Sequence, residues 1–419
     1  MTRMTRWYAY TAAALLAVSL IAPATVAPAA AQSRSAAPQT KKAPAKPAVA
    51  APQPPQLPER IPFTAADEAA AAVPGMPDAR FWADSVEDFK AALPAQPGPW
   101  IAFSSGGADG AFGAGLLNGL TESGKRPDYA VVTGVSTGAL MAPFVFAGPK
   151  YDAALRAYTK ITAADVFEIG NTGESFLDSW PLKDLIAKQI TPELLVDIAA
   201  AHNAGRRLFV VTTDLDAERS VVWNMGAIAV HGGDAALKLF RTILLASSAI
   251  PGGFPPVLID VEANGKRFQE MHVDGGVGGQ FFVAPAALMA ATSDYKLPAT
   301  QLYVVINTGL QPEFHVVARN TPSVLTNTVG AAVKVDTRLM IDRAYNAARR
   351  SGVPFNVATV PADFSAPSRG PFDPDYMGAL FAVGEQMGKS ATPFANEPPA
   401  YPGRPSERLH EPDKTGANR

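Results

Sequence analysis

The 419-residue chain contains no cysteine. Disulfide bonds, thiolate metal ligands and attachment of a lipid to an N-terminal cysteine are therefore excluded. Histidine is scarce, with five in the chain, and no spacing of His, Asp and Glu is typical of a metal site, so we expect no metal and no cofactor. The 36 basic and 38 acidic residues nearly cancel, and without a basic surplus we expect no nucleic-acid partner.

The apolar run near the N-terminus is short. It covers about residues 8–22, follows Arg3 and Arg6, and leads to three alanines at residues 29–31 before Gln32. This pattern is typical of a secretory signal peptide, so we predict residues 1–31 to be one and the protein to be periplasmic or secreted, not a lipoprotein. The alternative is an uncleaved membrane anchor, although a spanning helix prefers about 20 apolar residues.

Bulky apolar residues are rare in two further segments. Residues 32–60 are rich in Ala, Pro and Lys, and residues 390–419 are polar and rich in Pro, so neither has the content of a packed core. We expect 32–60 to be a disordered linker whose lysines are able to touch an anionic surface, and 390–419 to be a disordered tail. Residues 61–95 are predicted to form a helical lead-in, and residues 96–389 a single domain.

Short β-branched runs alternate with helical stretches in that domain. The runs are typical of buried parallel strands and lie at residues 100–103, 129–133, 207–213, 301–307 and 355–360. Helical stretches are predicted at residues 234–247, 324–351 and 375–388. The alternation predicts an α/β fold, a three-layer α/β/α sandwich with a mostly parallel central sheet.

One predicted strand leads into a serine. Gly134, Val135, Ser136, Thr137 and Gly138 follow the run at residues 129–133 and precede a helical stretch. A strand, a sharp turn and a helix around one serine form a nucleophile elbow, whose tight turn requires small residues on both sides of the serine. The pentapeptide alone is a weak signal in a chain rich in Gly and Ala, so its interpretation depends on neighbouring motifs.

A glycine-rich loop at residues 104–115 follows the strand predicted at residues 100–103. The backbone N–H groups of such a loop suit a phosphate or an oxyanion. A dinucleotide site is disfavoured because the next strand ends in the serine turn, and a P-loop is disfavoured because the loop has no lysine. We interpret the loop as an oxyanion hole, since successive parallel strands bring both turns to one edge of the sheet.

A third motif, Asp274-Gly275-Gly276, closes a strand predicted at residues 267–273, which follows an Asn264-Gly265 hairpin signal. Asp-Gly-Gly by itself is most simply a turn. Beside the other two motifs, Asp274 becomes a candidate general base for Ser136.

Together these motifs resemble those of the patatin-like phospholipase family, over residues 100–388. The resemblance implies a Ser-Asp dyad without histidine, in which Ser136 is the nucleophile and Asp274 its base. It implies an oxyanion hole formed by Gly106, Gly107 and Ala108. The glycines of the supporting motifs are Gly110, Gly134, Gly138, Gly275 and Gly276. A fourth block, residues 246–256, is similar to an Ala-Ser-x-x-x-Pro segment of the family.

Two positions depart from the family pattern. Asp109 stands where the family usually has Arg or Lys, and Ser105 where it usually has the first loop glycine. The lost cation bears on headgroup preference more than on hydrolysis, because an oxyanion is stabilised mainly by backbone N–H groups.

The resemblance implies a lipid acyl hydrolase, of phospholipase A or esterase type, that cleaves carboxylic esters through an acyl-serine intermediate. Its partner would be a lipid or another acyl ester, with contact to a membrane surface. The stretch at residues 251–256, which includes Phe254, and the pair Phe281-Phe282 are candidates to line an acyl-chain groove, because aromatic and prolyl residues lie there beside the motifs; the alternative is that these residues are plain core.

Two alternatives stay open. A Ser-His-Asp triad would need a histidine late in the chain, and two fit that position: His272 shares a strand face with Asp274, and His315 follows a strand. His202, His231 and His410 are expected at the surface. The second alternative is a catalytically silent protein that binds lipid or a partner at the cell envelope.

Overall fold

The computed structural model describes residues 57–170, 173–312 and 316–400. The predicted signal peptide, most of the predicted linker, His315 and His410 lie outside these residues. Among the described residues, no helix combines the length and the apolar character needed to cross a bilayer.

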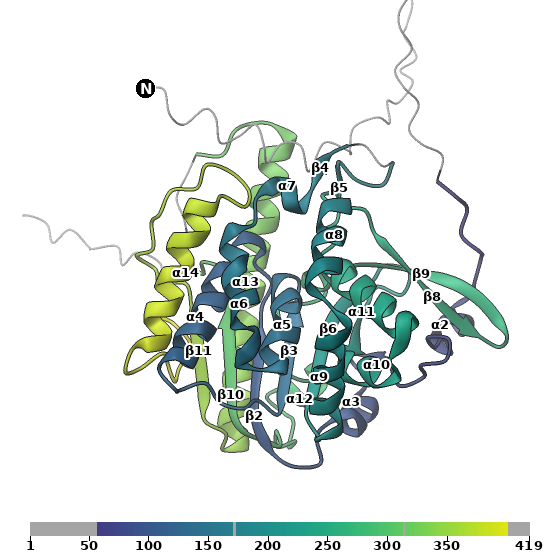
Figure 1. Ribbon diagram of the computed structural model, residues 1–419, viewed down its shortest axis with the longest axis horizontal. Coiled ribbons are helices and arrows are strands. Elements are labelled where there is room, and N and C mark those ends of the chain that lie inside the picture. Colours follow the sequence, from purple (N-terminus) through teal and green to yellow (C-terminus); the bar gives the residue numbers. More distant parts are fainter. Residues whose placement is uncertain (1–56, 171–172, 313–315, 401–419) are drawn as a thin grey trace, which may run out of the picture.

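A nine-stranded sheet forms the centre of the molecule (Figure 1). Its strands are β1 (Arg80–Trp82), β2 (Gly98–Phe103), β3 (Val131–Val135), β6 (Arg207–Asp214), β7 (Arg219–Asn224), β8 (Val257–Ala263), β9 (Lys266–Asp274), β10 (Ala299–Ile306) and β11 (Phe355–Thr359). A separate two-stranded sheet joins β4 (Glu168–Ile169) to β5 (Leu177–Asp178).

The strand order is β1-β7-β6-β3-β2-β10-β11, and β9 pairs with both β6 and β8. Strands β6, β3, β2, β10 and β11 are mutually parallel, whereas β1, β7, β8 and β9 pair antiparallel with their neighbours. Because consecutive parallel strands end at one edge, the turns after β2 and β3 lie side by side. The prediction of a mostly parallel sheet is confirmed.

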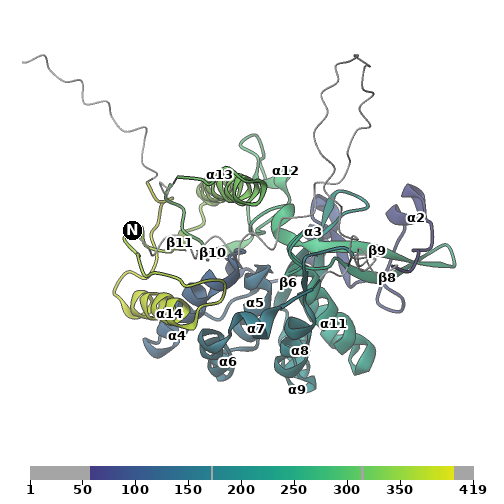
Figure 2. The same ribbon diagram turned by 90° about the horizontal axis from the view of Figure 1, so that it is seen from above.

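Helices cover both faces of the sheet (Figure 2). One face packs on α4 (Gly110–Glu122), α5 (Thr137–Ala147), α6 (Asp152–Ala157), α8 (Trp180–Gln189), α9 (Pro192–Asn203), α10 (Met225–His231), α11 (Gly233–Ser247) and α14 (Pro374–Lys389). The other packs on α3 (Val86–Ala92), α12 (Ala286–Met289) and α13 (Thr321–Ser351). Shorter helices are α2 (Ala65–Ala69), α7 (Ala163–Val166), η2 (Gly107–Asp109), η3 (Pro149–Tyr151), η4 (Tyr158–Lys160) and η5 (Gly275–Val277).

The apolar run of β2 shows why the parallel strands of the central sheet are buried on both faces. Ile101 and Phe103 belong to the core under α4 and α5, while Trp100 and Ala102 belong to the core under α13. Successive side chains of a strand point to opposite faces, so a strand covered by helices on both faces has apolar residues throughout. The three-layer prediction is confirmed.

The hairpin signal at Asn264-Gly265 marks the turn between β8 and β9. Both residues have positive φ, 53° and 77°, as a tight turn of this kind requires. The turn is important for function because β9 carries Asp274 at its end and pairs with β6, where Thr212 lies opposite Asp274.

The lead-in at residues 61–95 is not purely helical, and that prediction needs correction. Between α2 and α3, β1 extends the sheet by pairing antiparallel with β7. Phe81 packs edge-on against Phe209, with ring centroids 5.7 Å apart. A three-residue edge strand is too short to produce a period in the sequence, and only its packing defines it.

The expected disorder of residues 390–419 is also wrong for its described part. Ala395 forms two backbone hydrogen bonds with Val357 of β11, of 2.8 and 2.9 Å. Phe394 packs on Tyr303, with centroids 5.0 Å apart. One aromatic anchor and two bonds hold the segment over the sheet edge despite its proline content.

Candidate active site

Ser136 occupies the sharp turn between β3 and α5. Its backbone has φ 55° and ψ −122°, a strained conformation for a residue with a side chain. A Cβ atom on Gly134 would lie 2.3 Å from the carbonyl oxygen of Gly138, and one on Gly138 would lie 2.6 Å from that of Phe103. The two glycines therefore allow the turn to close against β2.

Asp274 accepts a hydrogen bond from Ser136. The Ser136 Oγ to Asp274 Oδ2 distance is 2.6 Å, and each residue is only 5% exposed. The second oxygen, Oδ1, accepts the N–H of Gly276 at 2.7 Å. A Cβ on Gly275 would lie 2.3 Å from the Val211 carbonyl oxygen, so glycine is required for the turn to reach this position.

Burial raises the pKa of Asp274 to about 6, although the hydrogen bonds from Ser136 and Gly276 oppose the shift. A carboxylate is a weak base at its usual pKa. The dry site brings this carboxylate closer to the range in which it accepts a proton and remains ionised at neutral pH.

The block at residues 246–256 holds the backbone of both Ser136 and Asp274 in place. Ser247 Oγ accepts the N–H of Ser136 at 3.0 Å and donates to the Val211 carbonyl at 2.7 Å. The Ala249 carbonyl accepts the N–H of Asp274 at 2.9 Å. The sequence resemblance drew attention to this block, but its positioning role is visible only in the fold.

The glycine-rich loop forms a turn of 3-10 helix, Gly107–Asp109, before α4. The first N–H groups of such a turn have no acceptor within it, which leaves those of Gly107 and Ala108 available to an oxyanion. Gly107 and Ser136 line the same pocket. A Cβ on Gly106 would lie 2.2 Å from the Asn307 carbonyl oxygen, and one on Gly110 would lie 2.2 Å from Thr137 Oγ1, so both glycines allow close packing of the loop.

Three side chains that the motifs did not indicate hold this loop. Tyr158 Oη donates to the Gly107 carbonyl at 3.0 Å and contacts Thr137 Oγ1. Asn307 joins the loop to β10, since its Nδ2 donates to the Ser104 carbonyl at 3.0 Å and its Oδ1 accepts the N–H of Gly113 at 3.1 Å. Gln280 connects the loop to the Asp274 turn.

The hydrogen bond to Gln280 gives a structural role to Ser105, which stands where the family usually has a glycine. The Ser105 hydroxyl donates to Gln280 Oε1, and Gln280 Nε2 donates to the Gly276 carbonyl at 2.7 Å. Asp109, the other departure from the family pattern, accepts a 2.8 Å hydrogen bond from Tyr376 of α14. Both departures thus have partners in the fold.

Among the described histidines, none bonds to Ser136 or Asp274. His272 is fully buried and bonds to Thr212 at 3.0 Å and Glu270 at 3.2 Å. His231 is exposed, as expected, and pairs with Asp78. His202 differs from expectation, since it is half-buried and desolvation lowers its pKa to about 4.

An apolar pocket opens beside the serine. Ser136 lines it together with Leu140, Tyr158, Ile161, Leu182 and Leu185, and these five side chains also line a second, adjoining pocket. The other residues that line the adjoining pocket are Phe144, Ala154, Ala157, Ile186, Gln189, Ile190 and Leu244. Phe254 lines the pocket at Ser136, as predicted.

Phe281 does not line this pocket. It belongs to the core on the opposite face of the sheet, beside Met340 and Met289. The expectation that it borders an acyl groove is therefore wrong, because proximity to a motif in sequence does not determine the face on which a side chain lies.

The elbow, the glycine-rich loop and the Asp274 turn, all carried by a largely parallel sheet, place the domain among α/β folds with a nucleophile elbow. Comparison with family models defines a narrower class than the fold does. Residues 101–287 match the family model of patatin-like phospholipases, so this part of the chain is a patatin-like phospholipase domain. Such a domain supports lipid acyl hydrolysis as the general activity.

Comparison with solved structures and with curated proteins adds little to this assignment. The crystal structure of VipD from Legionella pneumophila aligns with 12% identity and a TM-score of 0.34, covering 70% of this chain and 68% of that one. No curated protein matches the chain.

Proposed function

We propose that the protein hydrolyses carboxylic esters of lipids through Ser136 and Asp274. The 2.6 Å hydrogen bond between Ser136 Oγ and Asp274 Oδ2 in a nearly dry site is the observation that carries this proposal. A carboxylate within hydrogen-bond distance of a serine on an elbow is the arrangement that general-base activation requires.

In the first half of the reaction, Ser136 Oγ attacks the ester carbonyl as its proton passes to Asp274. The N–H groups of Gly107 and Ala108 stabilise the oxyanion of the tetrahedral intermediate. The intermediate collapses as the alcohol leaves with the proton from Asp274, and an acyl group stays on Ser136. In the second half, Asp274 takes a proton from water as the water oxygen attacks the acyl-serine. The second tetrahedral intermediate then collapses: the bond to Ser136 Oγ breaks, Oγ takes the proton back from Asp274, and the carboxylic acid leaves.

The pocket supports a substrate with an apolar acyl chain. Its walls beside Ser136 are mostly aliphatic or aromatic, and five of these side chains also line the adjoining pocket between α5, α6 and α8. An acyl chain that enters there buries its methylene groups, which favours lipid esters over small polar ones.

We also propose that the protein acts outside the cytoplasm and meets its substrate at a membrane surface. The N-terminal pattern supports export. Three exposed apolar residues support surface contact. Ile250 lines the pocket and is 49% exposed, Ile169 belongs to β4, and Trp180 begins α8 and bonds to Glu168 of β4. The segment that leads into β5 bonds to Gly252 and Gly253, close in sequence to Ile250. Ile169→Asp, outside the pocket at Ser136, is expected to reduce co-sedimentation with phospholipid vesicles while hydrolysis of a soluble short-chain ester is kept.

The direct test is hydrolysis of a medium-chain p-nitrophenyl ester by the purified protein and its variants. Ser136→Ala and Asp274→Asn are expected to abolish turnover, whereas Asp260→Asn, on the exposed face of β8, retains it. His202, His231, His272, His315 and His410 are replaced singly, and loss with one of them would favour a triad. If the parent is inactive on every ester offered, lipid binding without catalysis becomes the better account.

A further inference from the structure

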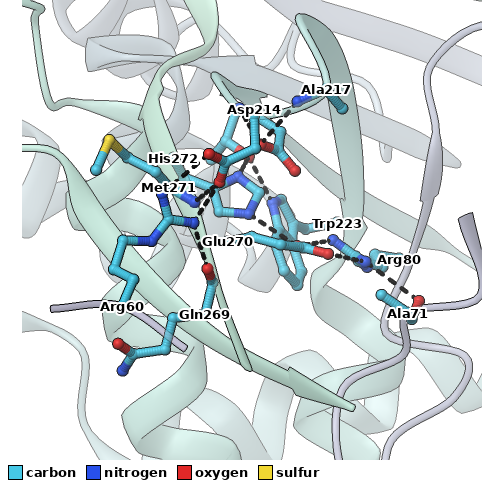
Figure 3. Close-up of polar contacts among 12 residues, drawn as sticks. Arg60, Ala71, Arg80, Asp214, Ala217, Trp223, Gln269, Glu270, Met271 and His272 are labelled. Carbon is cyan, nitrogen blue, oxygen red and sulfur yellow. Dashed lines mark hydrogen bonds and ion pairs between the residues drawn. The ribbon is translucent and has the colours of Figure 1, made fainter. Parts of the chain in front are cut away.

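A second cluster of ionisable side chains lies beyond the Ser136 site. Asp214, Glu270 and His272 converge where β6 meets β9 (Figure 3). One carboxylate oxygen from each acid and one imidazole nitrogen lie within 4.8 Å of one another, and all three residues are fully buried. Glu270 and His272 lie on β9, the strand that ends at Asp274, and Asp214 ends β6, which pairs with β9.

A further buried carboxylate, that of Glu68 on α2, lies beside this cluster and is independent evidence for a ligand there. It is only 7% exposed, and neither of its carboxylate oxygens accepts a hydrogen bond from an N–H group or an ionised donor among the described residues; its one polar neighbour at that range is the carboxyl of Asp214. Asp214 Oδ2 also has no such donor among these residues, while its Oδ1 accepts the N–H of Asp216 at 2.8 Å. Glu68 interacts electrostatically with Asp214, Glu270 and Arg80, which places its carboxylate against theirs. Buried carboxylate oxygens without partners are costly.

The charges of the cluster do not balance. The Arg80 guanidinium donates to both oxygens of Glu270, with an Nη2 to Oε1 distance of 2.6 Å, and also interacts electrostatically with Glu68, whereas Asp214 has no cation paired with it among the described residues. Arg60 is nearby but pairs with Asp216. When all three carboxylates are ionised, two negative charges remain, which is the charge that one divalent cation neutralises.

We propose that Glu68, Asp214, Glu270 and His272 bind one divalent transition-metal ion. Three oxygen donors with one imidazole nitrogen suit Mn²⁺ or Zn²⁺ better than Ca²⁺ or Mg²⁺, which prefer oxygen alone. Thr212 Oγ1 contacts His272 Nδ1 at 3.0 Å and accepts from Trp223 Nε1 at 2.8 Å, so the ring orientation is held from behind. Coordination replaces the 3.2 Å hydrogen bond between His272 Nε2 and Glu270.

The ion joins segments that are far apart in the sequence. Glu68 comes from α2, Asp214 from β6, and Glu270 and His272 from β9. Glu68 also lines an open pocket with Thr64 and Ala217, which offers a path from solvent. The ion therefore acts as a clamp that fixes α2 on the β6–β9 ladder, and it takes no step in ester hydrolysis.

The competing arrangement is a shared proton. Burial raises the pKa of Glu68 to about 9, so a protonated Glu68 is able to donate to Asp214 without any ion. The two arrangements differ in the effect of Glu68→Gln. Glutamine reproduces the protonated acid but is a poor metal ligand, so it disrupts only ion binding.

The experiment uses the full chain, freed of metal with EDTA and then titrated with Zn²⁺, Mn²⁺ and Mg²⁺ by calorimetry and by thermal unfolding. We expect one Zn²⁺ or Mn²⁺ per chain, a rise in Tm on binding, and a loss of at least about 10-fold in affinity in Glu68→Gln and in Asp214→Asn. Asp216→Asn, next to the cluster and paired with Arg60, is the matched control and is expected to keep the affinity.

Two results would overturn the proposal. One is the absence of binding by the parent together with an unchanged Tm in Glu68→Gln, which would establish the shared proton. The other is equal affinity in the parent, Glu68→Gln and Asp214→Asn, which would place the ion elsewhere. Neither measurement depends on ester hydrolysis, so the result stands apart from the test of Ser136.

Discussion

At the scale of single residues, the environment of Asp274 determines how the proposed reaction depends on pH. Its carboxylate is the base, so only the ionised form is active, and its pKa is raised to about 6 by burial. We expect kcat/KM to rise with pH, to reach about one tenth of its plateau near pH 5, and to level off above pH 7. The profile is recorded in EDTA, because an ion bound beside β9 would lower this pKa.

The raised pKa of Asp274 also predicts the direction in which the stability of the fold changes with pH. A carboxyl whose folded pKa lies above its ordinary 3.8 binds its proton more tightly in the folded state. Its contribution to the free energy of unfolding is present below pH 3.8 and is lost as the pH rises through 6. A kcat/KM profile that is flat between pH 5 and 8 would contradict the assignment of Asp274 as the base.

Tyr158 is the residue-scale test of the oxyanion loop. In Tyr158→Phe the Gly107 carbonyl and Thr137 lose a common partner, so the loop N–H groups are less well fixed. We expect kcat to fall about 10-fold, less than the loss of a whole oxyanion donor, with KM nearly unchanged and the pH midpoint unmoved. Tyr129→Phe is the matched control, because the buried Tyr129 hydroxyl has no hydrogen-bond partner among the described residues. Equal losses in both variants would mean that the effect is structural.

At the scale of elements, α5, α6 and α8 line the apolar pocket that adjoins the one at Ser136. Ala157, the last residue of α6, lines this adjoining pocket, and a larger side chain there shortens the available space. We expect Ala157→Phe to lower kcat/KM for a twelve-carbon ester by about 10-fold or more relative to a four-carbon ester, because each buried methylene contributes about 0.8 kcal/mol.

The control for chain length is on the other face of the sheet. Phe281→Leu changes a buried aromatic residue beside α13, away from the pocket at Ser136. It is expected to lower stability and leave the ratio of long-chain to short-chain turnover unchanged. If Ala157→Phe lowers turnover equally for both esters, the acyl chain lies elsewhere.

At the scale of the whole molecule, the predicted N-terminal leader is tested by the mass of the mature protein. Expression of the full chain in a bacterial host is expected to yield a periplasmic or secreted product that begins at Gln32, because Ala29, Ala30 and Ala31 form the predicted cleavage site. Intact-mass measurement of the exported fraction provides the check. A product that keeps residues 1–31 and sediments with membranes would favour the anchor instead.

The motifs that were predictable from sequence are those whose requirements are local. The turn at Ser136 needs Gly134 and Gly138 because a Cβ atom there would collide with backbone, and that constraint appears in five consecutive residues. The five parallel strands and the helices predicted at residues 234–247, 324–351 and 375–388 were predictable because their apolar content follows from burial on one or two faces, whereas the antiparallel strands β7 and β8 were not predicted. The Asn264-Gly265 turn was predictable because positive φ favours these residues.

Local sequence was enough to predict the fold class, the pair Ser136 and Asp274 as candidates, and the loop at residues 106–108. The side chains that support them became visible only in the folded chain: Tyr158, Ser247, Gln280 and Asn307 reach the site from separate elements. The same holds for the pairing of β1 with the sheet, the place of Phe281 on the far face, and the approach of Glu68 to Asp214. Such contacts depend on how distant elements are placed relative to one another, and no local spacing encodes that placement.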